Sequence, residues 1–231
     1  MGKYDAEKTE VLEVSRRLSR EGYFGARGGT SGNVSVLVPG EDAIAVTPSG
    51  LGYETMTPDD ICVVGFDLAP LEGEHKPSVE TPMHIAVYRN REDVSAVIHT
   101  HQPHASVFSV LHMPIPVLFD ELAVAIGPSV AVAPYGLSGT QDLLDAVVSV
   151  LGNRCHCYIM RNHGALCVGP DLTRAHYFVE LLEKAAMVYH NALATRRPVH
   201  TLPGELAERL HKDVLAAQDE AAAARRAAYG A

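Results

Sequence analysis

The sequence lacks any uninterrupted apolar run approaching the roughly 20 residues that a membrane-spanning helix needs. Its N-terminal segment, MGKYDAEKTEVLEVSRRL, also lacks the apolar stretch of a secretory signal. Position 6 is Ala6, where a myristoylation signal has serine or threonine. We therefore expect no membrane partner and a cytoplasmic location.

Basic charge is scarce as well. The 231 residues include 19 lysines and arginines against 28 aspartates and glutamates, a formal net charge of −9. Because nucleic-acid phosphates attract basic surfaces, this balance argues against a nucleic-acid partner, although it is compatible with a local basic pocket for a small anion. A hydrophobic share of 47% without a long polar tract indicates an ordinary globular protein.

Cysteine is limited to four residues that form no C-x-x-C pair of the kind used by zinc knuckles. Cys155 and Cys157 would share one face of a strand, with Cys167 ten residues beyond Cys157 and Cys62 far away in the sequence. We expect buried free thiols, as in a protein of the reducing cytoplasm.

Helical and strand patterns alternate along the chain without an internal repeat or a linker-like break. We expect one α/β domain over residues 1–231, with a core of about 5–200 and a C-terminal helix and tail over 201–231. Because hairpin turns also occur, the sheet should be mixed and flanked by helices. Helices are predicted over 5–21, 81–91, 103–112, 139–152, 171–195 and 204–231, and strands over 34–38, 43–50, 61–70, 94–101, 129–135 and, as a pair, 157–169.

The segment AVIHTHQPHA is the most informative part of the sequence. If residues 94–101 form a strand, His99 and His101 lie on one face with their Cα atoms about 7 Å apart, where two imidazoles can converge on one divalent ion. The strand ends at Gln102, which places both histidines at the edge of the sheet, where α/β proteins build their sites. His104 should lie on the following helix and face away.

Two further segments offer candidate ligands. His163 follows an apolar strand in RNHGA, and Glu80 precedes a helix in KPSVETPMH. Three imidazoles leave a zinc-like ion an open position, as in a catalytic site, but spacing alone does not join His163 to the other two histidines. His84, four residues after Glu80, is expected to cover the helix surface rather than to serve the site.

The glycine-rich segment GGTSGN matches neither the P-loop nor the dinucleotide fingerprint. Its backbone N–H groups, with Thr30, Asn33 and Ser49, could hold an anion. Taken alone, such a segment is more often a structural turn.

Several motifs together resemble the class II aldolase/adducin superfamily, which holds L-fuculose-phosphate aldolase and L-ribulose-5-phosphate 4-epimerase. The resemblance spans roughly residues 5–200 and implies a central, mixed and largely antiparallel sheet. The matching motifs, in the family's order, are GTSGNVSV, TPSG followed by YE, KPSVETPMHIAVY, IHTHQPHA, APYG with a later GT, and NHG before a long helix.

The resemblance also implies a metal site. A divalent ion, usually zinc, would be held by His99, His101 and His163, and manganese or cobalt would also suit three imidazoles. Glu80 would be the acid/base residue and, in some members, a further ligand. The ion stabilises the enediolate formed when a ketose C–C bond breaks, while the glutamate moves a proton. Family members are commonly homotetramers with sites at subunit interfaces.

A substrate phosphate would meet Asn33, Ser49, Gly50 and Ser78, close to the loop that carries Thr30. Aldolases of the family carry a second serine where this chain has Val79, which removes one hydroxyl donor. A phosphorylated substrate would then bind differently, or the substrate would carry a carboxylate or no anion at all.

Two further features bear on the proton donor. The fuculose-phosphate aldolase pattern has a tyrosine where this chain has Asp120, followed by Glu121. This acidic pair indicates either another acid or another reaction, unless it is only a solvated turn. Tyr229 resembles the tyrosine of a tail that closes over the site.

The sequence therefore predicts a zinc-dependent carbon–carbon lyase, an aldolase acting on a small, sugar-derived, phosphorylated ketose. Alternatives within the superfamily are a metal-dependent decarboxylase of a keto or hydroxy acid, a pentulose-phosphate 4-epimerase and, less favoured, a thioribulose-phosphate dehydratase. A non-catalytic scaffold like the adducin head is disfavoured, because a scaffold need not keep the set of Glu80, His99, His101 and His163.

Overall fold

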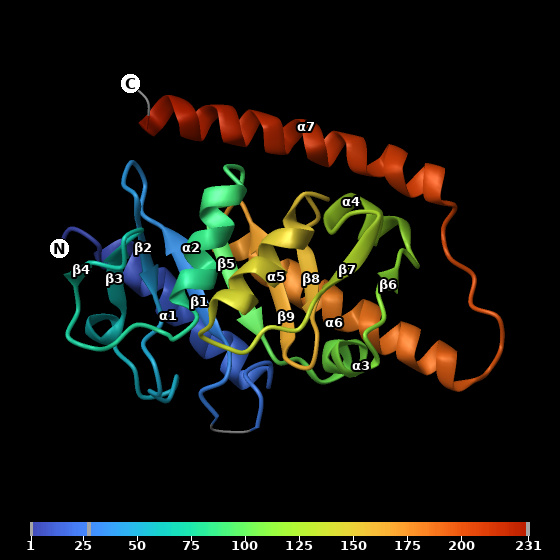
Figure 1. Cartoon of the computed structure of the whole chain (residues 1–231), viewed down its shortest axis with the longest axis horizontal. Helices are drawn as coiled ribbons and strands as arrows, with labels where there is room; N and C mark the ends of the chain where they lie inside the picture. The colour runs from blue at the N-terminus through green and yellow to red at the C-terminus, as the bar shows by residue number, and fades with distance from the viewer. Residues whose placement is uncertain (1, 27–28, 230–231) are drawn as a thin grey trace.

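The computed structural model describes residues 2–26 and 29–229, whose strands form one nine-stranded sheet in the order β4-β3-β2-β1-β5-β9-β8-β7-β6 (Figure 1). Neighbouring strands are antiparallel except β7 and β8, which a helical crossover makes parallel. The strands are β1 (Asn33–Leu37), β2 (Ala43–Val46), β3 (Cys62–Gly65), β4 (Pro70–Glu72), β5 (Ala96–Thr100), β6 (Ile115–Pro116), β7 (Ser129–Ala133), β8 (Cys157–Met160) and β9 (Gly164–Gly169). The helices are α1 (Asp5–Arg20), the 3-10 turn η1 (Pro58–Asp60), α2 (Thr81–Asn90), α3 (Pro103–Leu111), α4 (Asp120–Ala125), α5 (Gln141–Leu151), α6 (Leu172–Ala194) and α7 (Gly204–Tyr229).

Helices cover both faces of the sheet, and alternation along each strand divides the core in two. In β5, Ala96 and Ile98 pack with α1, α3 and α6, whereas Val97 packs with α2 and α5 on the other face. His99 has the same parity as Val97, so β5 directs it toward the α2 side. The strand thus places the imidazole of His99 on the face of the sheet that α2 covers, and α2 begins after Glu80.

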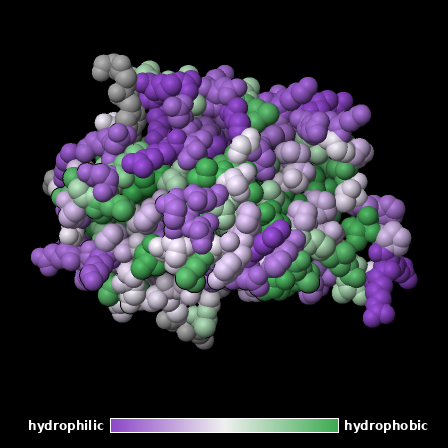
Figure 2. Space-filling view, viewed as in Figure 1, coloured by the Kyte–Doolittle hydropathy of each residue, from purple (hydrophilic) through white to green (hydrophobic). Residues whose placement is uncertain are grey.

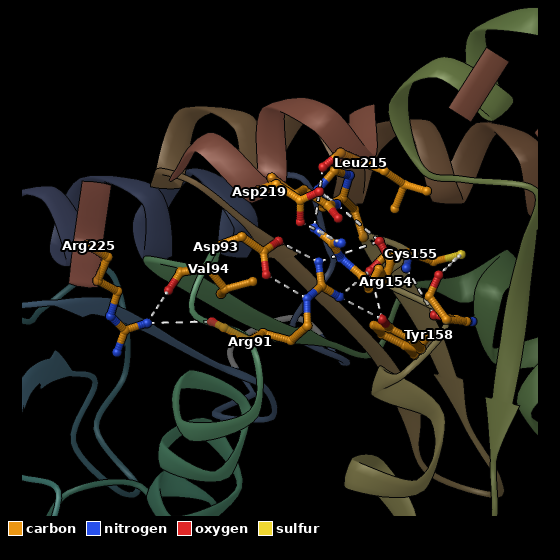
Figure 3. A network of polar contacts seen from close by, with 12 residues as sticks. Arg91, Asp93, Val94, Arg154, Cys155, Tyr158, Leu215, Asp219 and Arg225 are labelled. Carbon is orange, nitrogen blue, oxygen red and sulfur yellow. Dashed lines mark hydrogen bonds and ion pairs between the residues drawn. The ribbon is translucent and has the colours of Figure 1, made fainter. Parts of the chain in front are cut away.

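A polar network that is buried at Arg91 and Asp93 and more exposed toward α7 ties this helix to the rest of the molecule (Figure 3). Arg91 and Asp93 form a bidentate ion pair just before β5, with N–O distances of 2.8 and 2.7 Å. Arg225 of α7 donates to the Val94 carbonyl at 3.2 Å, and Arg154 pairs with Asp219 at 2.8 Å. The C-terminal half of α7 therefore lies at the start of β5, at the opposite end from His99.

The predicted fold class is confirmed, and the predicted helices and strands match observed elements to within a few residues. The predicted strand over 61–70 is in fact β3 with β4 after it, and η1, β6 and α4 were not predicted. Asp171 caps α6 by accepting the Arg174 N–H at 2.7 Å. The four cysteines are buried free thiols, as expected.

The surface in the same view is largely hydrophilic along α7, with apolar atoms dispersed between polar ones elsewhere (Figure 2). No helix within the described ranges combines the length and the apolar character that a membrane crossing demands.

Candidate metal centre and its carboxylate

Three imidazoles meet where β5 ends and β9 begins. The Nε2 atoms of His99 and His101 lie 2.9 Å apart, and the ligand atoms of His99, His101 and His163 all lie within 4.8 Å of one another. His99 is fully buried in the strand, and the other two are partly buried. The sequence pattern placed the first two together, and the fold adds His163 from the turn between β8 and β9.

Gly164 makes this approach possible. A Cβ atom there would press against the Thr100 carbonyl oxygen and would lie 3.1 Å from His99 Cε1 and 3.2 Å from His101 Cδ2. Such contacts are too close for a side chain, so only glycine allows the start of β9 to pass beside the histidines.

The turn that carries His163 is held by α3. Ser109 Oγ donates to the Met160 carbonyl at 2.7 Å and accepts the His163 N–H at 3.0 Å. Ser109 has no sequence signal of its own, because its partners lie more than 50 residues away and meet it only in the fold.

The protonation states of His99 and His101 favour the binding of a cation. His99 Nδ1 donates to the Ala165 carbonyl at 2.9 Å, so the neutral ring presents an unprotonated Nε2 to the other imidazoles. Burial lowers the pKa of His99, and burial with the neighbouring His99 and His163 lowers the pKa of His101 to about 3. Neutral imidazoles with converging lone pairs are the form that binds a divalent metal ion.

Glu80 closes the fourth side of the cluster as the N-cap residue of α2. Its Oε1 lies 3.1 Å from His163 Nε2, and its Oε2 lies 3.4 Å from His99 Nε2. Burial alone would raise the pKa of Glu80, but hydrogen bonds from His163 and from the Asn33 amide lower it below its usual range. The carboxylate is therefore ionised and within reach of the space between the imidazoles.

Ser138 is a contact that sequence reasoning missed. It lies in the loop between β7 and α5, and its hydroxyl donates to Glu80 Oε1 at 2.9 Å. A serine in a loop has no periodic signal, and only the path of the chain brings it to the carboxylate.

The expectation that His84 covers the helix surface was wrong. Its side chain is fully buried, and its Nε2 lies 2.5 Å from Asn33 Oδ1. Asn33 in turn donates to Glu80 Oε2 at 2.7 Å. Both faces of α2 are covered, one by the sheet and the other by α5, so a polar residue inside the helix need not reach solvent.

The residues expected to bind a phosphate lie on neighbouring segments. A bridge between Pro48 and Pro77 brings Ser49 and Gly50 beside Ser78, whose hydroxyl accepts the Glu80 N–H at 3.2 Å. Thr30 is exposed in the loop before β1.

Val79, the predicted departure from the family pattern, is 61% exposed directly before Glu80. This position therefore presents an apolar side chain where a hydroxyl would stand in the aldolase pattern.

The remaining sequence candidates lie outside the cluster within this chain. Asp120 is exposed as the first residue of α4, and Glu121 is held by Tyr177 at 2.8 Å and Lys184 at 3.0 Å. Tyr229 ends α7, and its side chain lies outside the described residues. As expected, His104 faces away from the cluster, pairing with Glu183 at 2.7 Å.

The profile of the "Class II Aldolase and Adducin N-terminal domain" matches residues 9–190. The chain belongs to this family. A "5-deoxy-D-ribulose 1-phosphate aldolase" of Bacillus thuringiensis is 32% identical over 206 residues, which cover 89% of this chain and 94% of that protein. An "L-fuculose phosphate aldolase" of Escherichia coli O6:H1 is 35% identical over 196 residues, covering 85% of this chain and 88% of that protein.

A solved "L-fuculose 1-phosphate aldolase" structure superposes with a TM-score of 0.83 and 30% identity, covering 93% of this chain and 98% of the other. Class II aldolases are generally metal-dependent, and the imidazole cluster gives this member a fitting donor set. Its three nitrogen donors and one carboxylate match the ligand chemistry of a catalytic zinc-like ion.

Proposed function

We propose that this protein is a sugar-phosphate aldolase, a metal-dependent lyase that cleaves a carbon–carbon bond of a ketose 1-phosphate. The observation that carries the proposal is the meeting of His99, His101 and His163 with the ionised Glu80. Relatives named as aldolases cover most of the chain, and they do not favour the decarboxylase or the epimerase alternative.

In this proposal the three imidazoles hold a divalent ion, and we infer zinc because the donor set is nitrogen-rich and leaves an open position. The ion would supply the positive charge that polarises the ketose oxygens. Glu80 moves the proton at the carbon next to the carbonyl, and Ser138 and Asn33 hold its two oxygens in place. His99 and His101 stay neutral because burial lowers the pKa of each.

Further parts of the proposal concern the substrate and the assembly. Asn33, Ser49, Gly50 and Ser78, with Thr30 nearby, would bind the phosphate, and an amide NH2 keeps a second hydrogen for an anion after Asn33 has bonded Glu80. Asp120 and Tyr229 would act on the site of a neighbouring subunit in a homotetramer. The exposed apolar pair Val110 and Leu111 on α3 supports contact with other copies. Four reduced thiols suit a cytoplasmic enzyme.

The test combines metal analysis with a cleavage screen. Protein purified without chelator should hold about one zinc ion per chain, and ketose 1-phosphates should yield dihydroxyacetone phosphate in a coupled assay. Carbon dioxide release from carboxylated analogues would instead support a decarboxylase. A chain with neither metal nor turnover would be a scaffold.

Glu80→Gln should retain the metal and the fold but lose turnover by about 100-fold or more, because the amide cannot take up a proton. The matched control is Glu13→Gln, which changes an exposed glutamate of α1 and should leave the rate unchanged. A Glu80→Gln variant with wild-type turnover would move the proton-transfer role to another residue.

A further inference from the structure

Behind Glu80, a row of buried polar side chains runs between β1 and α2, and we call this row the Glu80 relay. Asn33 bonds Glu80 at 2.7 Å and His84 at 2.5 Å, and Ser35 bonds His84 Nδ1 at 2.7 Å and the Tyr88 hydroxyl at 2.7 Å. All five side chains are buried. None of the chemistry proposed above uses His84, Ser35 or Tyr88.

The relay follows from the rise per residue of β1 and of α2. Glu80, His84 and Tyr88 are spaced by four residues, which advances a helix by about 6 Å and returns to the same side. Asn33 and Ser35 are spaced by two residues, which advances a strand by about 6.6 Å and returns to the same face. The steps match, so side chains of the strand fit alternately between side chains of the helix.

The hydrogen positions in the relay are determined one after another, starting from the carboxylate. An ionised carboxylate only accepts, so Asn33 turns its NH2 group toward Glu80 and its carbonyl oxygen toward His84. His84 Nε2 must then carry a hydrogen. Burial lowers the pKa of His84 to about 3, so the ring is neutral and Nδ1 is an acceptor.

The same reasoning fixes the far end of the relay. Ser35 has one hydroxyl hydrogen, which it donates to His84 Nδ1, so the Tyr88 hydroxyl is the donor in its contact with Ser35 Oγ. The same Tyr88 hydrogen also faces the Ser35 backbone carbonyl at 3.0 Å, so Ser35 Oγ and this carbonyl share it. Burial raises the pKa of Tyr88, which keeps that hydroxyl protonated. Every hydrogen bond in the relay therefore points toward Glu80.

We propose that His84 is a positioning residue, which fixes the orientation of the Asn33 amide and through it the Glu80 carboxylate, while Ser35 and Tyr88 hold His84 in the required tautomer. The inference rests on the proposed role of Glu80 in proton transfer. Without the Ser35 hydroxyl, His84 can move its hydrogen to Nδ1. Its Nε2 then accepts, the Asn33 amide turns over, and a carbonyl oxygen faces the carboxylate.

The matched substitutions are Ser35→Val and Ser35→Thr. Valine and threonine have nearly the same shape and crowd β1 equally, but only threonine keeps the hydroxyl. We expect Ser35→Val to lower kcat by about 10- to 100-fold, the usual cost of losing a partner that orients a metal-site residue. KM and metal content should be unchanged, and Ser35→Thr should recover most of kcat. Equal kcat in the two variants would overturn the proposal.

A second measurement reads the tautomer directly and does not depend on turnover. In metal-free protein labelled with ¹⁵N-histidine, His84 should show a protonated Nε2 and an unprotonated Nδ1 in the wild type and in Ser35→Thr. Ser35→Val should shift the population toward the other tautomer. A wild-type His84 with its hydrogen on Nδ1 would overturn the proposal.

The two proposals fail in distinguishable ways. If the wild type cleaves no ketose 1-phosphate, the proposed function fails, while the tautomer measurement still decides the relay. If Ser35→Val does not fold, Tyr88→Phe removes the outermost donor and leaves the bond between Ser35 and His84. That variant should lower kcat less than tenfold with KM unchanged, and an equal loss in kcat and rise in KM would contradict a positioning role.

Discussion

At the scale of single residues, the histidine cluster depends on Gly164, which contributes no side chain at all. Its role differs from that of a glycine in a turn, because what matters is the close approach of the backbone to His99 and His101. A glycine beside two clustered histidines is thus part of the candidate site, although it has no side chain to bond there.

Gly164→Ala should separate the imidazoles and remove the metal, and activity should fall by about 100-fold or more, as small displacements of reacting groups commonly do. The control is Gly152→Ala at the end of α5, where a Cβ atom meets nothing within 4 Å and φ is −62°. Metal content by elemental analysis and turnover check both variants. Full metal retention in Gly164→Ala would show that the strands can separate without cost.

Val79→Ser restores the hydroxyl that the aldolase pattern places before the glutamate. Because Val79 is 61% exposed, the change should leave the fold intact. A hydrogen bond to a charged phosphate is worth about 1.5–3 kcal/mol, so KM for a ketose 1-phosphate should fall by about 10- to 100-fold. Steady-state kinetics with phosphorylated and unphosphorylated ketoses measure the difference. An equal effect on both substrates would mean that this position does not face the phosphate.

At the scale of helices and strands, periodicity predicted the long elements, because each buries a face whose spacing can be read in the sequence. The turn η1 and the elements β6 and α4 are only two to six residues long and show no period, so packing alone defines them. The long helices were placed to within about two residues at each end, where end positions normally vary.

The residues of the candidate site also fall into two groups, those that sequence spacing predicts and those that it does not. His99 and His101 follow from strand alternation, whereas His163 and Glu80 were joined to them by resemblance, since residues so far apart in the sequence have no shared spacing. His84 was misjudged although it repeats Glu80 at four residues. The repeat correctly placed it on the side of Glu80, but the burial of that side depends on β1, which the helix sequence does not reveal.

Helix α7 should open more readily than the rest of the protein. Among its described side chains only Ala207, His211 and Gln218 are buried. The partly buried Leu210 packs against the core, and polar contacts such as Arg154 with Asp219 add to the attachment. Hydrogen exchange followed by mass spectrometry should show α7 exchanging before β5, with the core over about 5–200 still protected. Equal protection of α7 and β5 would mean that the helix unfolds only with the whole chain.

At the scale of the whole molecule, buried neutral histidines make stability depend on pH. Burial lowers the pKa of His84 to about 3 and that of His156 to about 4, against about 6.5 in an unfolded chain. Below pH 6.5 the unfolded chain takes up protons that the folded chain refuses. The stabilisation is complete above that pH and is lost as the pH falls toward 4.

Metal-free protein should therefore lose about 2–5 kcal/mol of its free energy of unfolding between pH 7 and pH 4.5. Urea unfolding at a series of pH values measures this loss. His156 donates to the Ala125 carbonyl at 2.7 Å and stacks on Phe178, and His156→Gln removes its titration. That variant should be less stable at pH 7 but should show a smaller loss on acidification. An unchanged slope would assign the effect to other groups.

The equal advance of β1 and α2 has a consequence for protein design. One oxygen of a carboxylate can be held by regular elements if a strand carrying Asn-x-Ser lies under a helix that begins at Glu and continues with His and Tyr at successive fourth positions. In this chain those positions are Asn33, Ser35, Glu80, His84 and Tyr88. Because rigid elements supply both sides of the arrangement, it could be built into a scaffold where a helix covers a strand at this spacing, and only the second oxygen, which Ser138 holds here, would need a loop.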